Sequence, residues 1–391
     1  MNGFDGPHSV LTFKEYEEVN KGTDKNTADT ADDLQLPLVG LFGETGSLVT
    51  LYKKKWRDKN AYPTIAHDLL EEMGDLLWYL TNVSRRVGTS LEEIARDSFS
   101  QLKDFRPKAG LAFSDIDRLA ETQESVSQQK LVASLATLGS AAAQILATSG
   151  SLEDFKRTLP PLLSVMLKAL VEVSVITDTK LNDAALANIG KTLDRWPIEV
   201  HPIALFDDSF NEHEQLPRKF TVEFQELQLG SKTYVYQKFN NVHVGDRLTD
   251  NIVDSDFYRF HDAFHWTYAA VLGWSPVTRG LLRCKRKEKP DIDENEDGAR
   301  AAIIEEAIAV WIFHQAKDPD INFFENITSL DFHVLKAVHD LTRGYEAEKI
   351  PLWLWERAIL DSYKIFRELK RHRNGFIDGD LSHRTIAFRS Q

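Results

Sequence analysis

Residues 67–80 read HDLLEEMGDLLWYL, and this stretch has the pattern of an amphipathic helix. Glu72 and Asp75 lie three positions apart, so they project from adjacent turns of one face and could both reach one cation. Such carboxylates repel one another at the border of a core, unless a cation or a basic partner offsets their charge. The alternative is a solvated helix face that spells EExxD by chance. The side expected to face the core is a row of apolar residues: Leu69, Met73, Leu76 and Leu80.

The upstream stretch PLVGLFGETGSLVTLYKKKW, residues 37–56, places Glu44 among glycines in an apolar segment. A glycine inside a helix costs about 1 kcal/mol relative to alanine, so several of them indicate close approach of another helix. That approach is expected to bring Glu44 against Glu72 and Asp75. The resulting all-oxygen site suits Mg²⁺ or Mn²⁺. The glycines are Gly40, Gly43 and Gly46.

GETGSL, followed by EEMGDLLWYL and then GTSLEEI, resembles the MazG family of all-α nucleoside triphosphate pyrophosphohydrolases, over about Leu36 to Arg106. That family pairs an ExxE helix with an ExxD helix. The resemblance implies Mg²⁺-dependent hydrolysis of a ribo- or deoxyribonucleoside triphosphate between the α- and β-phosphates, which yields a monophosphate and pyrophosphate. Ser47 stands where the family has its second ExxE acid, which lowers the expected metal affinity and leaves the activity open. The implied metal ligands are Glu44, Glu72 and Asp75, and the implied catalytic carboxylates are Glu71 and Glu72.

Four basic residues and a tryptophan follow Glu44 at the end of its expected helix. The basic residues could meet phosphate oxygens, and cations also stabilise a helix C-terminus in their own right. The tryptophan is the candidate for stacking on a base. These candidate substrate-binding residues are Lys53, Lys54, Lys55, Trp56 and Arg57.

The whole chain is expected to be mainly α, with three domains. Residues 1–110 form the MazG-like four-helix domain, and residues 125–200 form a degenerate helical repeat of it that lacks the acids. The two copies would pack as an intrachain pseudo-dimer, and homo-oligomers of the whole chain stay open. After a linker at Asp207 to Gln215, residues 215–391 form a helical domain that begins with a small β-hairpin and ends in a loose tail. This region resembles the C-terminal extension of some MazG-domain proteins.

A second cluster of chemically active residues lies in DFYRFHDAFHWTYAAVLGW, residues 256–274. His261 and His265 are four apart, a spacing that lets both imidazoles address one ion. One interpretation is a second metal or nucleotide site for Mn²⁺, Fe²⁺ or Zn²⁺, and another is a buried polar cluster that ties helices together. The adjacent His261 and Asp262 also permit an HD-type phosphohydrolase. Two acids match the positions of Glu71 and Glu72 in a further repeat, namely Glu305 and Glu306.

The net charge of −13 and the pI of about 5.4 argue against stable binding to nucleic acid. The single cysteine, Cys284, excludes an internal disulfide framework and fits a reducing cytoplasm. No signal segment or membrane-spanning run is expected from the sequence, so membrane association is not expected either. A different class of function is a nucleotide sensor that binds without turnover, and a role in phage defence fits either class.

Overall fold

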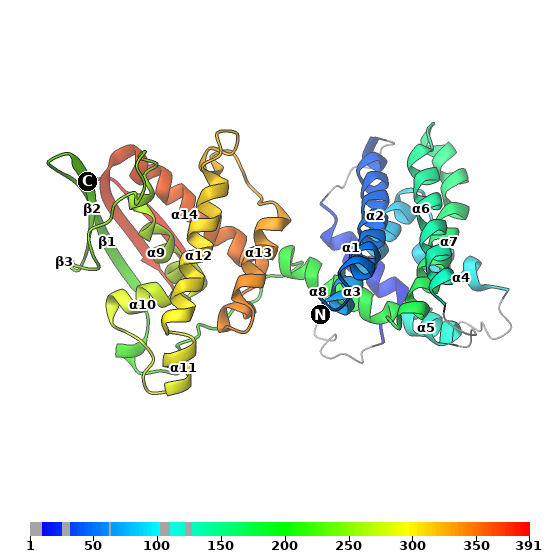
Figure 1. The fold of residues 1–391 in the computed structure, drawn as a ribbon, viewed down its shortest axis with the longest axis horizontal. Helices are drawn as coiled ribbons and strands as arrows, with labels where there is room; N and C mark the ends of the chain where they lie inside the picture. Colours follow the sequence, from blue (N-terminus) through cyan, green and yellow to red (C-terminus); the bar gives the residue numbers. More distant parts are fainter. Residues whose placement is uncertain (1–9, 26–31, 62–63, 102–109, 122–126) are drawn as a thin grey trace. The chain divides into compact units, whose positions relative to one another are not determined.

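The computed structural model describes residues 10–25, 32–61, 64–101, 110–121 and 127–391. Over these residues the chain is mainly α, as the sequence predicts. It divides into two compact units, Met1–Glu199 and Val200–Gln391 (Figure 1). The first nine residues and Arg106, the expected end of the MazG-like segment, lie outside the described residues. The division into three domains, at residues 1–110, 125–200 and 215–391, stays a prediction.

The first unit is a helical bundle with one hydrophobic core. Helix starts are set by local capping: Thr12, Ser90 and Ser151 each accept a hydrogen bond from the backbone of the first turn, in a reciprocal capping box. Its helices are α1 (Phe13–Thr23), α2 (Gln35–Asp58), α3 (Ile65–Arg86), α4 (Leu91–Phe99), α5 (Phe113–Glu121), α6 (Gln128–Ala147), α7 (Leu152–Thr177) and α8 (Leu181–Arg195).

The two halves of this unit, α1–α4 and α5–α8, repeat one set of contacts. The N–H of Phe13 donates to Leu111 O at 2.9 Å, and the N–H of Phe113 donates to Leu11 O at 3.0 Å. The Glu17 carboxylate accepts the first N–H groups of α4, just as Asp117 accepts those of α8. The halves therefore face each other with two-fold-like contacts.

Two helices of this unit, α6 and α7, are long and apolar enough to cross a membrane by length and composition alone. The sequence-based expectation that no apolar run reaches that length is therefore corrected. Figure 1 shows the two helices side by side, and they also contact α2 and α4. Their buried faces supply part of the bundle core, which accounts for their apolar composition.

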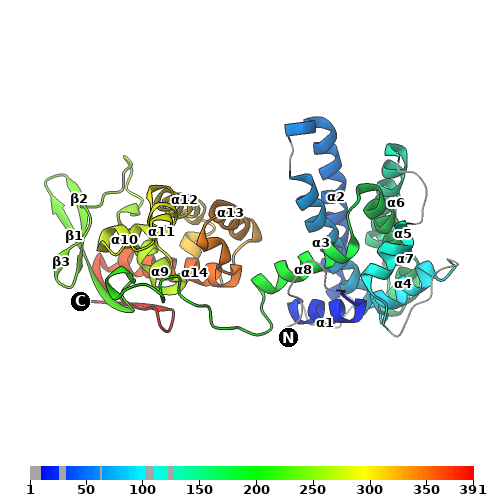
Figure 2. The same cartoon turned by 90° about the horizontal axis from the view of Figure 1, so that it is seen from below.

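The second unit has a five-stranded antiparallel sheet among its described residues, in the order β3-β2-β1-β4-β5. Helices α9 and α14 pack against each other and contact β4 and β5 (Figure 2). The core lies between these layers. The elements are β1 (Lys219–Leu229), β2 (Lys232–Phe239), β3 (Val242–His243), α9 (Asp262–Leu272), α10 (Pro276–Leu282), α11 (Pro290–Asn295), α12 (Ala299–Ala316), α13 (Phe332–Thr342), α14 (Leu352–His372), β4 (Asn374–Asp380) and β5 (Thr385–Arg389).

The structure corrects two local expectations in this unit. The expected loose tail after His372 forms β4 and β5, because β4 pairs with β1 and extends the predicted hairpin into a sheet. The expected linker is part of the folded unit, because Asp207 is buried and its carboxylate accepts from Arg279 at 2.7 Å and Arg218 at 2.8 Å.

Candidate active site in the first unit

Helix α3 carries the acidic row at the edge of its buried face. Leu69, Met73, Leu76 and Leu80 are buried, as the helical period predicts. The neighbouring Glu71, Glu72 and Asp75 are only partly exposed. The fold therefore holds three carboxylates at the border of the core.

Helix α2 packs along α3 and brings Glu44 to Glu72, as the sequence predicts. The two carboxyl groups lie close enough for their charges to interact. Burial, and then the charges of Glu44 and Asp75, raise the pKa of Glu72 to about 8. Burial and the charge of Asp75 also raise the pKa of Glu44. Near neutral pH a proton on Glu72 therefore reduces the negative charge of this cluster. A bound metal cation would have the same effect.

Helix α8 supplies two partners of the acids that the sequence analysis missed. Lys191 Nζ lies 2.6 Å from Asp75 Oδ2 and 3.1 Å from Glu71 Oε1. Asn188 Nδ2 donates to Asp75 Oδ1 at 3.0 Å. Burial raises the pKa of Asp75, although Lys191 acts in the opposite direction. Spacing along one helix could not reveal these contacts, because they join residues more than 110 positions apart.

The glycines near the site have different roles from those expected. A Cβ atom at Gly40 would lie 2.2 Å from the Tyr79 ring, so this glycine does permit close packing of α2 on α3. Gly43 and Gly46 face open space, so the predicted reason for them is wrong. Instead Gly74 permits close approach of α8, because a Cβ atom there would lie 2.7 Å from Ala184 O and 2.8 Å from Asn188 Cβ.

The predicted substrate-binding residues lie at the far end of α2. At a rise of about 1.5 Å per residue, they start about 14 Å along the axis from Glu44. Trp56 is 43% exposed, which leaves its ring available for stacking. Arg57 is held by Asp58, with Nε 2.6 Å from Oδ1. Lys53, Lys54 and Lys55 lie on the same turns of α2, and the substrate-binding role of all five residues stays a prediction.

Two sets of three side chains, searched over the described part of the chain, have ligand atoms within 4.8 Å of one another. One is His67, Asp68 and Glu71, which adjoins the acidic row of α3. The other is His261, His265 and Glu306 in the second unit. The predicted set of Glu44, Glu72 and Asp75 offers only carboxylate oxygens, a donor chemistry that fits a hard divalent cation. Its role as the metal site stays a prediction.

In the second unit, the structure brings the predicted C-terminal residues together. His265 Nδ1 lies 2.8 Å from Glu305 Oε1, and His265 Nε2 lies 3.4 Å from Glu306 Oε1. His261 Nε2 lies 3.1 Å from Asp262 Oδ1. Asp262 also accepts a hydrogen bond from Gln237, a partner that the sequence analysis did not name. These contacts make a polar cluster around the start of α9 that is buried except at Glu306.

Comparison with known proteins places the second unit in a family. Residues 201–391 match the model of the MazG C-terminal domain. The chain is also similar to the Gene 37 protein of Mycobacterium phage L5, with 26% identity over 92 residues that cover 23% of this chain and 81% of that protein. No solved structure matches the chain significantly. Residues 201–391 therefore belong to the MazG C-terminal domain family.

Proposed function

We propose that the first unit hydrolyses nucleoside triphosphates, with ribose or deoxyribose, to the monophosphate and pyrophosphate. One observation carries the proposal. Burial and the charges of Glu44 and Asp75 raise the pKa of Glu72 to about 8, and burial and the charge of Asp75 raise that of Glu44. Excess negative charge therefore gathers on these acids, although in the described part of the chain their ligand atoms do not all lie within 4.8 Å of one another. The C-terminal family match supports it, because this domain points to a MazG-like nucleotide pyrophosphohydrolase family.

Glu44, Glu72 and Asp75 would hold Mg²⁺, and Mn²⁺ suits the same donors. When bound, the metal supplies charge neutralisation for the phosphates and a more acidic water. Ser47 adds a neutral hydroxyl where the family has an acid, so fewer charges compensate the cation.

Glu71 and Glu72 are the candidates that accept the proton of the attacking water. Without a metal the pKa of Glu72 is raised to about 8; bound Mg²⁺ would favour its ionised form, which can accept a proton. Glu71 Oε1 already accepts a hydrogen bond from Lys191 Nζ at 3.1 Å, so that oxygen is less available to a water. Lys191 also places a positive charge beside the acids, where it would attract a phosphate.

A nucleotide sensor is the second candidate, and a specific contact favours it. Lys191 Nζ lies 2.6 Å from Asp75 Oδ2 and neutralises a carboxylate that the metal would need. Together with Ser47, this contact favours binding of a nucleotide with weak turnover or none. The predicted cytoplasmic location and the absence of stable nucleic-acid binding apply to both candidates.

The test is pyrophosphate release from a panel of common and modified nucleoside triphosphates, with Mg²⁺ or Mn²⁺. The enzyme proposal expects release by the full chain and its loss in Glu72→Gln, which keeps the size of the side chain. Glu153→Gln on α7 is the control, because that side chain is 80% exposed and lies outside the acidic cluster. Metal-dependent nucleotide binding without release would support the sensor. If neither release nor binding occurs, both proposals fail.

A further inference from the structure

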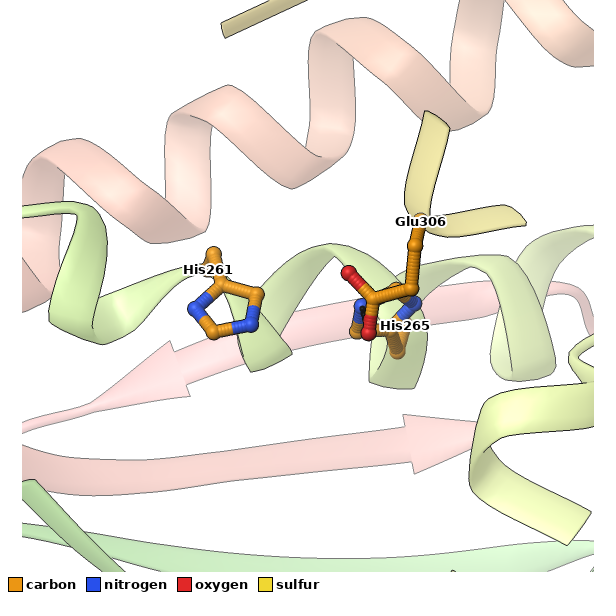
Figure 3. Close-up of side chains that lie close together, drawn as sticks. All are labelled: His261, His265 and Glu306. Carbon is orange, nitrogen blue, oxygen red and sulfur yellow. Dashed lines mark ion pairs between the residues drawn. The ribbon is translucent and has the colours of Figure 1, made fainter. Parts of the chain in front are cut away.

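Helices α9 and α12 bring two histidines and a glutamate together in the second unit. His261 and His265 lie one turn apart at the start of α9, and Glu306 reaches the His265 ring from α12 (Figure 3). One ligand atom from each residue lies within 4.8 Å of the other two. Because His265 is fully buried, its ring nitrogens depend on the protein or a bound ligand for partners.

The surroundings of His265 determine which ring nitrogen is free. Nδ1 lies 2.8 Å from Glu305 Oε1. The buried Glu305 carboxylate also accepts from Ser275 Oγ at 2.6 Å and Val277 N at 2.8 Å, so it acts as an acceptor and Nδ1 carries the proton. Nε2 has no hydrogen-bond partner among the described residues and lies 3.4 Å from Glu306 Oε1. Burial lowers the pKa of His265, but Glu305 and Glu306 outweigh it and raise the pKa, so without a metal a proton occupies this position.

His261 is oriented in the same way. Its Nδ1 lies 2.9 Å from Tyr258 O, and a backbone carbonyl only accepts, so Nδ1 is again the donor. Its Nε2 faces Asp262 Oδ1 at 3.1 Å. Each Nε2 thus faces a carboxylate oxygen, an arrangement that needs a positive charge between them, either a proton on the ring or a metal cation. A divalent cation between the Nε2 atoms and the carboxylates would give each lone pair a partner.

We propose that His261, His265 and Glu306 bind one divalent transition-metal ion, with Glu305 and the Tyr258 carbonyl as the groups that orient the two rings. Two imidazoles and one carboxylate favour Zn²⁺, Fe²⁺ or Mn²⁺ over Mg²⁺. A histidine ligand that donates its other N–H to a carboxylate is the usual arrangement at such sites. Bond lengths of about 2.1 Å place ligand atoms about 3.0–3.4 Å apart, and the 44%-exposed Glu306 side chain has room to move that close.

The experiment uses the full chain with Glu72→Gln in every sample, so that the acidic site of the first unit contributes little. Metal is removed with a chelator, and the protein is titrated with Co²⁺, followed by visible absorption, and with Zn²⁺ in competition. We expect one equivalent of Co²⁺ per chain, with the absorption of a nitrogen-ligated ion. Glu306→Gln and His261→Gln should each weaken binding at least about 10-fold.

His314→Gln is the matched control, because His314 is exposed on the same α12 helix, two turns beyond Glu306. It should bind Co²⁺ like the parent. Circular dichroism reports whether each variant is folded, and Glu306→Gln is the decisive variant because that side chain is the most exposed of the three. A parent that binds no Co²⁺, or a folded Glu306→Gln with the parent's affinity, would overturn the proposal and leave a protonated histidine cluster in its place.

Discussion

Helices α3 and α7 occupy matching places in the two halves of the first unit, and their buried residues agree position by position. A shift of 90 positions superimposes the core-facing residues of α3 on those of α7. Both sets belong to one hydrophobic core. The buried pairs are Leu69 with Leu159, Met73 with Leu163, Leu76 with Met166, Leu77 with Leu167, and Leu80 with Leu170.

The same shift shows where the halves differ. Glu72 and Asp75 of α3 match the apolar Leu162 and Val165 of α7. Asn188 of α8 donates to Asp75, whereas the matching Ser98 of α4 shares a hydrogen bond with Ser164. The core contacts are thus common to both halves, whereas the acidic row lies only on α3, in the half α1–α4, among the compared positions. The comparison indicates that the core and the caps maintain the fold, and that the acidic residues are dispensable for it.

The largest expected effect comes from making α3 resemble α7 at the acidic position. Glu72→Leu introduces the residue found at position 162 and removes the carboxyl whose pKa is raised by burial and the charge of Glu44. Losing a group that only hydrogen-bonds to a metal ligand typically lowers activity roughly 10- to 100-fold. Because Glu72 is a proposed ligand itself, pyrophosphate release should fall by more than that. Thermal unfolding at pH 8 without metal should occur at a higher temperature, because a crowded, half-buried charge is gone.

Leu162→Glu is the reciprocal change. It should leave pyrophosphate release at the parent level, because Leu162 lies on α7, in the half of the unit that lacks the acidic row. Unchanged release in Glu72→Leu would show that the difference between the halves is not catalytic.

A smaller effect is expected from Lys191, which links α8 to the acids. Lys191→Met removes the cation from Asp75 and Glu71, so both carboxylates lose that compensating charge. Urea denaturation in a chelator should give a free energy of unfolding about 2–3 kcal/mol lower, somewhat below the cost for a fully buried pair because a quarter of the lysine side chain is exposed. Lys191→Arg keeps the charge and should lose less. A Mg²⁺-dependent recovery in Lys191→Met would show that the metal substitutes for the lysine.

The acidic half should also make stability depend on pH. Folding raises the pKa of Glu72 from 4.5 to about 8, so the folded chain binds this proton more tightly than the unfolded chain. Stability is therefore lost as the pH rises between these values. Glu44 and Asp75 shift in the same direction.

Urea denaturation from pH 5 to pH 8 in a chelator measures this slope. Glu72→Leu should flatten it, and Mg²⁺ should restore stability at pH 8. A slope that is identical in the parent and in Glu72→Leu would assign the pH dependence to other groups.

The helices and the acidic row could be predicted because both follow from a period of 3.6 residues within one segment. Lys191 could not, because its surroundings read as an ordinary amphipathic helix and its partners lie more than 110 positions away. Strand β4 was missed because NGFIDGD is rich in residues that strands disfavour, and pairing with β1 overrides that local preference. The helical period was thus sufficient to predict α3, but it could not identify Asn188 and Lys191 as the partners of its acids.

The smallest expected effects concern two glycines that differ only in what surrounds them. Gly74→Ala places a Cβ atom 2.7 Å from Ala184 O, so α8 must shift away from α3, at a cost of about 1–3 kcal/mol. The matching position in α7 is Ser164, which shows that the scaffold itself tolerates a side chain where no helix approaches so closely.

Gly43→Ala is the control on α2, because a Cβ atom there meets nothing within 4 Å. It should stabilise the chain by about 0.5–1 kcal/mol, since alanine is the better helix former. Urea denaturation of both variants measures the difference. If Gly74→Ala were as stable as Gly43→Ala, close packing of α8 on α3 would not be what holds Asn188 and Lys191 against the acids.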